Sequence, residues 1–127
     1  MLSGAHLAPA AFRAAKSGSS TSNVPGTGTT VTYEDSAASS TAVTALKPTK
    51  GHLRNGKCMA AGGGKRCTRN VVLGSFVHDD TAGADQFHFS GRIGGHALPS
   101  GSYLLVLTPH ANGHAGATTR LSFRIVP

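Results

Sequence analysis

Two cysteines are the residues of this 127-residue chain whose types and spacing most directly imply chemistry. Cys58 and Cys67 bracket a basic stretch that contains three consecutive glycines. In an oxidising compartment such a pair is expected to form one disulfide, which would stabilise this short loop by about 2.5 to 3 kcal/mol. A zinc site is disfavoured, because structural zinc needs four ligands and usually closely spaced Cys pairs. Two free thiols remain the alternative if the protein is intracellular.

Four basic residues form the one charge cluster of the chain: Lys57, Lys65, Arg66 and Arg69. Twelve Lys and Arg face five acids, and the net charge is +7. Such a balance attracts polyanions weakly, among them nucleic acid, anionic lipid and acidic wall polymers. Scattered, solvated charge is the simpler interpretation, and we expect no specific nucleic-acid binding. The cluster is nevertheless the candidate anion-binding site.

Seven histidines raise the question of a metal site. His110 and His114 share one loop, and His96 lies in a neighbouring turn region. His88 is on the exposed side of its expected strand. Three such side chains can bind zinc or copper, but loop tips offer no rigid surroundings to orient them. We therefore expect solvated histidines and no metal.

The acidic residues do not form a recognisable catalytic or calcium-binding pattern. Asp79, Asp80 and Asp85 surround one expected turn without the spacing of a calcium loop, and turn formation explains them. Glu34 and Asp35 are adjacent, so in a strand they point to opposite faces and do not suit a carboxylate pair. Neither a nucleophile elbow nor a phosphate-binding loop occurs. We expect no enzyme and no cofactor.

The elements that must position these residues are predicted to be strands. Ser, Thr, Gly and Val are abundant, Glu occurs once and Trp is absent, which favours an all-β fold. The length allows one domain over residues 1–127. Apolar residues alternate in six segments, and about seven strands predict an Ig-like or fibronectin-III-like two-sheet antiparallel sandwich. The six segments are 29–34, 41–46, 70–78, 86–90, 103–107 and 119–126.

Several details of the arrangement follow from turn residues and proline. Segments 29–34 and 41–46 are predicted to pair as a hairpin that Pro48 ends. Gly74 predicts a bulge or bend. The last strand and an N-terminal strand containing Pro9, with Leu7 and Phe12 in the core, are the expected edges.

Two long segments show no regular spacing of apolar residues, and one short motif predicts a tight corner between strands. Residues 16–28 are predicted to be a flexible loop, and residues 49–69 a Cys-closed basic loop. Leu98, Pro99 and Tyr103 resemble the tyrosine corner of Ig-like sandwiches, in which the Tyr hydroxyl bonds to upstream backbone.

Motifs spread over most of residues 7–126 carry a resemblance to a known family. They are GTTVTY, RCTR, GSFVH, AGADQFHFSGRIGGHALPSGSYLLVLTP and the terminal SFRIV. Together they resemble Ig-like β-sandwich modules of secreted and surface proteins from high-GC Gram-positive bacteria, often C-terminal. PHANGH at 109–114 departs from the family, which usually has an Asp there, and the loop before Cys67 is Gly-rich instead of Arg-rich. The resemblance implies an accessory module without catalytic activity.

These observations predict a non-catalytic extracellular structural, spacer or interaction module, secreted or at the cell surface. Its partners would be other domains or subunits of a surface protein. One alternative is a binding module for an anionic cell-wall polymer or carbohydrate that uses residues 57–69. Another is a self-assembling surface or filament subunit. No apolar run approaches the length of a membrane span, and Met1 to Gly4 does not begin a signal peptide.

Overall fold

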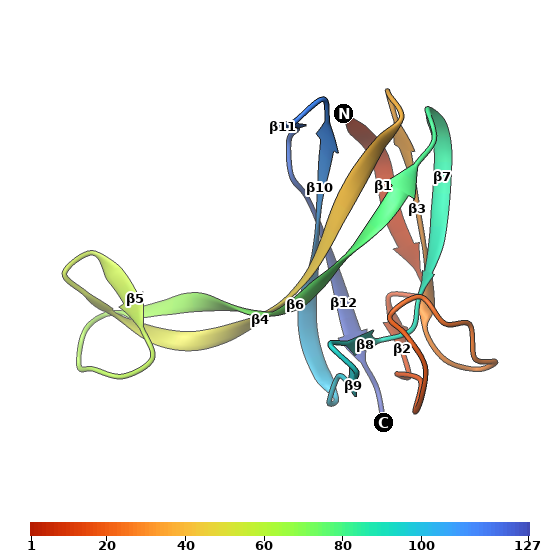
Figure 1. Cartoon of the computed structure of the whole chain (residues 1–127). Helices are drawn as coiled ribbons and strands as arrows, with labels where there is room; N and C mark the ends of the chain where they lie inside the picture. Colours follow the sequence, from red (N-terminus) through yellow and green to blue (C-terminus); the bar gives the residue numbers. More distant parts are fainter.

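The computed structural model describes all 127 residues, which form a two-layer all-β sandwich (Figure 1). One antiparallel sheet has the order β1-β3-β7, made of β1 (Leu2–Ala8), β3 (Thr29–Asp35) and β7 (Gly83–Phe89). The other has the order β2-β12-β10-β4-β6, made of β2 (Ala11–Phe12), β12 (Thr119–Ile125), β10 (Gly101–Ala111), β4 (Ser39–Arg54) and β6 (Arg66–Asp80). The short strands are β5 (Lys57–Met59), β8 (Arg92–Ile93), β9 (His96–Ala97) and β11 (His114–Ala115).

The all-β sandwich predicted from the sequence is confirmed. In the terms used for Ig-like domains, β12, β10 and β4 occupy the positions of strands G, F and C. The facing sheet supplies the positions of strands A, B and E. All pairs within the sheets are antiparallel except β2 with β12.

The core lies between the two sheets and is filled by the alternating residues that the sequence singled out. Val31 and Phe89 come from one sheet, and Leu105 and Phe123 from the other, and all four are buried. The Phe89 and Phe123 rings meet edge to face with centroids 5.5 Å apart, so aromatic contact joins the layers. Alternation predicted these inward positions because one face of each strand is covered.

The predicted hairpin of β3 with β4 is wrong. β3 pairs with β1 and β7, whereas β4 pairs with β10 and β6, so residues 36–38 cross from one sheet to the other. Alternation shows which face of a strand is buried, but it does not show which sheet the strand joins.

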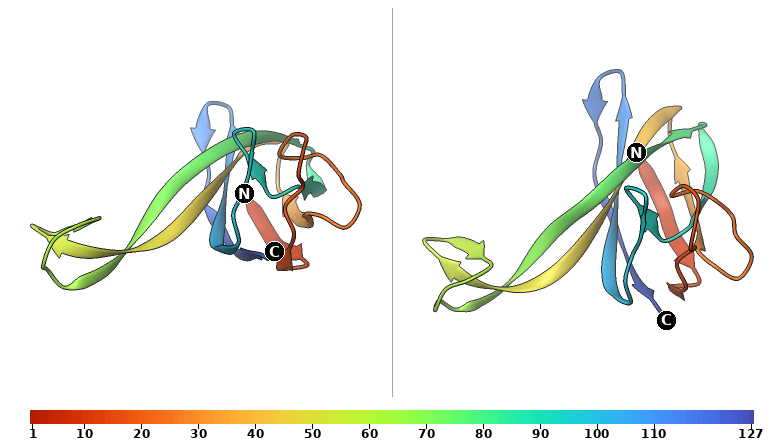
Figure 2. Two further views of the ribbon diagram at one scale, coloured as in Figure 1. Left: turned by 90° about the horizontal axis from the view of Figure 1, so that it is seen from below. Right: turned by 60° about the horizontal axis from the view of Figure 1, so that its bottom comes forward.

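Pro48 does not end β4, and residues 49–69 are not simply a loop. β4 and β6 continue together past the sandwich as a projecting twisted hairpin, with β5 at its tip (Figures 1 and 2). β10 pairs with β4 only as far as Leu46, so at Pro48 β4 has a neighbouring strand on one side only. A strand paired on one side tolerates proline, because one row of N–H groups needs no partner. We call residues 49–69 the arm.

Of the two expected edges, the N-terminal one is confirmed, because β1 and β2 each lie at the end of a sheet, whereas the other requires correction. β12 lies between β10 and β2, so the last strand is not the edge of its sheet; the long edge strand is β6. Pro9, after a cis peptide bond, separates β1 from β2. Phe12 is buried and Leu7 is half-buried against the core, as expected.

Residues 16–28 contain no strand, and hydrogen bonds tie their first part to the sandwich. The Ser90 amide donates to the Ser20 carbonyl at 2.7 Å, and the Ser90 hydroxyl donates to the Ser19 carbonyl at 2.7 Å. At the same end of the sandwich, the Tyr103 hydroxyl donates to the Pro99 carbonyl at 2.6 Å, beside the buried Leu98. This is the geometry of a tyrosine corner.

Candidate functional site

The tip of the arm is a tight turn that reverses the chain from β4 into β5. Asn55 and Gly56 both have positive φ, 52° and 77°, which is the requirement of a type I′ hairpin turn. The turn places Arg54 directly opposite Lys57. Two cations therefore face each other at the tip of the arm.

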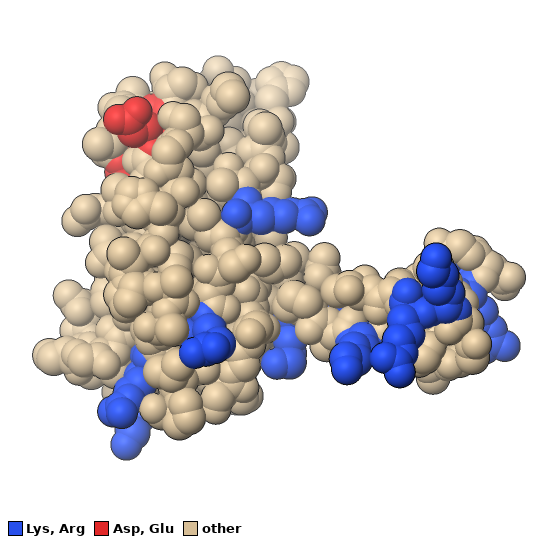
Figure 3. All heavy atoms as spheres, turned by 180° about the vertical axis from the view of Figure 1, so that it is seen from behind, with Lys and Arg blue, Asp and Glu red and all other residues tan.

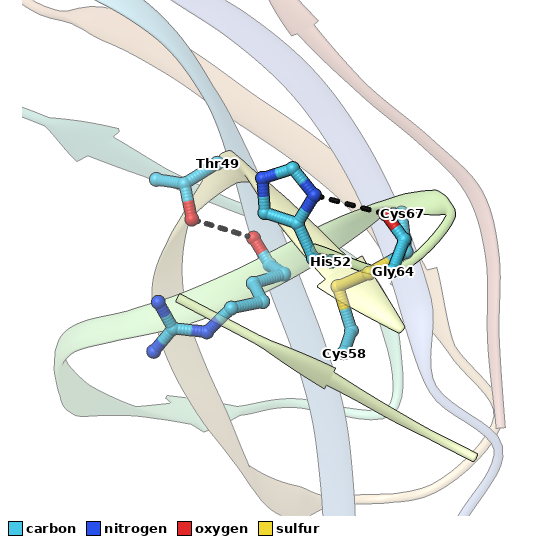
Figure 4. Close-up of a disulfide and its surroundings, with 6 residues drawn as sticks. Thr49, His52, Cys58, Gly64 and Cys67 are labelled. Atoms are coloured by element: carbon cyan, nitrogen blue, oxygen red, sulfur yellow. Dashed lines mark hydrogen bonds between the residues drawn. A yellow bond between two sulfur atoms is a disulfide. The ribbon is translucent and has the colours of Figure 1, made fainter. Parts of the chain in front are cut away.

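A disulfide between Cys58 and Cys67 links β5 to β6 across the central strand β4 (Figure 4). Gly51 of β4 lies beneath it, and a side chain there would come within 2.7 Å of the Cys58 sulfur and of the Met59 carbonyl oxygen. Gly64 is equally required, because a Cβ at that position would overlap the Leu53 carbonyl. Glycine at these two positions lets the crossing chains approach closely.

Hydrogen bonds hold the remainder of the arm, because it has no apolar core of its own. The Leu53 amide donates to the Lys65 carbonyl at 2.7 Å, which docks the glycine-rich segment on the end of β4. His52 Nδ1 lies 3.1 Å from the Gly64 carbonyl (Figure 4). No apolar side chain of the arm is buried.

The register of the arm sorts its side chains onto two faces. Residues opposite each other in an antiparallel pair share a face, and the face alternates along each strand. Gly51 pairs with Cys67 and Leu53 with Cys58, so these residues occupy the disulfide face. The opposite face, which we call the basic face, carries Lys50, His52, Arg54, Lys57 and Arg66.

Charge is distributed very unevenly between the arm and the sandwich (Figure 3). The arm contains six of the twelve Lys and Arg residues and none of the five acids, so it accounts for six of the seven net positive charges. Five of these six cations are exposed and Arg69 is half-buried. All five acids lie at one end of the sandwich, where β3, β6 and β7 end or begin.

The structure distributes the four cluster residues named from the sequence over different parts of the arm. Lys57 and Arg66 belong to the basic face, whereas Arg69 lies on the disulfide face, with its side chain against Gly51. Lys65 precedes β6 in the glycine-rich segment.

Sequence reasoning missed three members of the basic face. Lys50, His52 and Arg54 alternate along β4 and so point to one side. The Asn55-Gly56 turn immediately after them was the signal for a strand at this point.

The acidic end of the sandwich is organised by a buried carboxylate. Asp80 accepts hydrogen bonds from the hydroxyls of Tyr33 and Thr41, each at 2.5 Å, and His78 Nδ1 lies 2.8 Å from it. Burial, followed by the hydrogen bond to Asp80, raises the pKa of Tyr33 above its ordinary value. The carboxylate thus joins the two sheets through polar contacts.

Neighbouring acids also accept hydrogen bonds, although Oδ2 of Asp85 is buried without a partner. Burial alone would raise the pKa of Asp35, but the neighbouring Asp80 and the hydrogen bonds donated by the Ser39 hydroxyl, the Ala37 amide and the N-terminal ammonium outweigh it and lower the pKa to about 2. Asp85 accepts from the amide and hydroxyl of Thr81 at 2.9 and 3.1 Å, which is the turn role expected for it.

No group of three or more His, Cys, Asp or Glu side chains is arranged to hold a metal ion. His110 and His114 lie on paired strands of one hairpin, around the Asn112-Gly113 turn. His96 lies in β9, and His88 lies in β7 on the face opposite Phe87 and Phe89.

The disulfide indicates an oxidising environment, because such bonds persist mainly there. The structure contains no helix that is long and apolar enough to cross a membrane. No protein-family model matches this chain, and none of the curated proteins or solved structures compared with it matches either.

Proposed function

We propose that this protein is a non-catalytic interaction module in which the sandwich is a scaffold and the arm contacts an anionic polymer. The observation that carries the proposal is the basic face: five cationic or imidazole side chains on one side of a projecting hairpin that has no acid. An ordinary solvated surface mixes charges of both signs.

The electrostatics of the arm favour a bound polyanion. Like charges directly opposite each other in a sheet are destabilising, and Arg54 faces Lys57 without a carboxylate in the arm to compensate. A chain of phosphate, sulfate or carboxylate groups along the basic face relieves this repulsion and releases condensed counterions. A neutral carbohydrate supplies neither effect, so we favour the anionic class.

A purely structural spacer role is the competing function. It needs the sandwich and contacts to neighbouring domains, but it gives no reason for a charged hairpin that buries nothing. The arm therefore favours a binding module over a spacer, within the same non-catalytic class.

An extracellular or cell-surface location is part of the proposal and rests on the disulfide. Alkylation of the denatured, unreduced protein followed by intact-mass measurement tests it. No alkylation of Cys58 and Cys67 is the expected result. Two alkylated thiols in protein produced under oxidising conditions would remove the support for secretion.

The binding role is tested by titrating a fluorescent polyphosphate or a sulfated polysaccharide at several salt concentrations. Replacing Lys50, Arg54 and Lys57 together with Gln removes three cations of the basic face. Each lost phosphate contact is expected to reduce the slope of log K against log salt by about 0.7 to 0.9, so the triple variant should lose roughly 2 to 3 units.

A matched variant changes the same net charge on the sandwich, at the exposed residues Lys16, Arg120 and Arg124. It should bind nearly as the wild type does. An equal loss in both variants would show diffuse attraction by net charge and would contradict the proposal. Binding that is independent of salt would contradict it as well.

A further inference from the structure

Strand β6 has one long free edge. It pairs with β4 over its whole length, and no second strand is hydrogen-bonded to it; β8 contacts it only through Ile93, which packs against Gly74. None of the backbone hydrogen bonds formed outside the strand ladders involves a residue of β6. At about 3.3 Å per residue, its fifteen residues present an edge on the order of 50 Å long.

This edge lacks two of the devices that keep strands from pairing with other chains. Proline and lysine, which commonly protect edges, are absent from β6. Three of the six large apolar side chains that are exposed in the protein lie on it: Val72 and Val77, each 65 % exposed, and Leu73, 37 % exposed. An unpaired edge with apolar side chains is a template for a further strand.

The charges of β6 are arranged to complement the same strand running in the opposite direction. Arg66 lies near its beginning and Asp79 near its end, and both are exposed. In the pairing with β4, Arg66 lies opposite His52 and Asp79 opposite Ser40. Because His52 and Ser40 are separated by an even number of residues in β4, Arg66 and Asp79 point to the same, outer face of the sheet.

The bulge in β6 is what places these two charges on one face. Ala45 pairs with Gly74 but Leu46 pairs with Val72, so Leu73 is an extra residue. It inverts the alternation between the two halves of the strand. A point midway between Val72 and Leu73 lies equally many residues after Arg66 and before Asp79. A two-fold axis at this point would therefore exchange the positions of these two residues.

We propose that two copies of this chain pair antiparallel through β6, about a two-fold axis between Val72 and Leu73. Arg66 of each copy then lies opposite Asp79 of the second copy, on the outer face of a continuous sheet. The arm of each copy runs along the sandwich of the other. A two-fold contact of this kind is closed, so it gives a dimer and not a filament.

Apolar packing supports the same axis. Leu104, Leu46 and Val72 lie opposite one another on β10, β4 and β6 and form an apolar row that stops at the free edge. In this register Val72 lies opposite Leu73 of the second copy, so the apolar row continues into the mate through its own Leu73. The exposed Val72 and Leu73 side chains of the two copies then cover one another around the axis.

Sedimentation velocity over a wide range of protein concentration, without any polyanion, tests the pairing. The wild type is expected to show a concentration-dependent monomer–dimer equilibrium. Val72→Lys places two like charges at the axis and should weaken the dimer at least about tenfold. Arg66→Glu and Asp79→Arg should each weaken it by roughly tenfold, and the double charge reversal should restore it to within about threefold.

Arg124→Glu and Glu34→Arg are the matched charge reversals away from β6, and both should leave the equilibrium unchanged. Circular dichroism checks that each variant is folded. A wild type that is monomeric at all concentrations, open-ended oligomers, or a double reversal that does not restore the dimer would each overturn the proposal. Because no polymer is present, these outcomes are separate from those of the polyanion titration.

Discussion

β4 and β6 run through two regions that are held together by different physics. Inside the sandwich they bury Val43 and Ala45 completely and are covered by the facing sheet. In the arm the same two strands bury no apolar side chain and rely on ladder hydrogen bonds, a turn and one disulfide. A strand pair can therefore leave its core when local constraints replace hydrophobic burial.

This difference separates stability from the proposed binding function. Core positions of the sandwich are fixed by packing, so their substitution changes the free energy of unfolding. Exposed side chains of the arm contribute little to stability, so charged residues there can serve ligand binding without a large cost to folding. Variants in the two regions should consequently affect different measurements.

The largest expected effect is on the core. Leu105→Ala, at a fully buried site in β10, should lower the free energy of unfolding by about 2 to 5 kcal/mol. Leu53→Ala in the arm, where the side chain is 40 % exposed, should change it by less than about 0.5 kcal/mol. Denaturant unfolding followed by tyrosine fluorescence measures both, because Tyr33 and Tyr103 lie in the sandwich. Equal losses would remove the distinction between the regions.

Removal of the disulfide should act on the arm alone. In the variant with Cys58→Ser and Cys67→Ser, amide protection in the arm should fall by about 100-fold, corresponding to 2.5 to 3 kcal/mol of loop entropy. The free energy of unfolding of the sandwich should change by less than about 1 kcal/mol, since no core contact depends on the arm. Hydrogen exchange with residue resolution measures both. An equal loss of protection in β10 would show that arm and sandwich unfold together.

Smaller effects come from single hydroxyl groups. Tyr103→Phe removes the hydrogen bond to the Pro99 carbonyl and should cost about 1 kcal/mol. Thr49→Val removes the longer bond to the Arg69 carbonyl in the arm, 3.3 Å, and should leave the sandwich midpoint unchanged. Thermal unfolding of the two variants in parallel makes the comparison, and an unchanged midpoint for Tyr103→Phe would contradict the corner.

A further effect is confined to acidic pH. The pKa of Asp35 is about 2 in the folded protein, below the ordinary 3.8, so this carboxylate stabilises the fold above pH 3.8. That contribution is lost as the pH falls from about 4 through 2. Urea unfolding between pH 6 and pH 2 should show the gap between wild type and Asp35→Asn closing in this window. If the difference in unfolding free energy between the two proteins persists at pH 2, the destabilisation by Asp35→Asn comes from packing and not from the carboxylate charge.

The sandwich was predictable from sequence because its strands alternate. Tyr33, Phe87 and Leu107 were placed inward correctly, since each strand has one covered face. The assignment of β3 and β4 to different sheets was not predictable, because alternation carries no information on the pairing partner.

The arm was mistaken for a loop because strand prediction depends on apolar residues. In β4 its basic residues alternate with Gly51 and Leu53, which is too little apolar character to predict a strand, and the ladder hydrogen bonds leave no mark in the sequence. Only Asn55-Gly56 indicated a hairpin. The free edge of β6 could not be predicted, because it depends on which strands pair. The bulge at Leu73 was predicted approximately, from the neighbouring Gly74.

The most direct test of the central claim is a ¹H–¹⁵N chemical-shift titration of the protein with polyphosphate. The account predicts that the amides of Lys50, His52, Arg54 and Lys57 shift in a salt-sensitive manner while those of β10 and β12 stay in place. Shifts spread equally over Arg13, Lys16 and Arg120, or no shifts in the arm, would contradict the assignment of the basic face as the contact site.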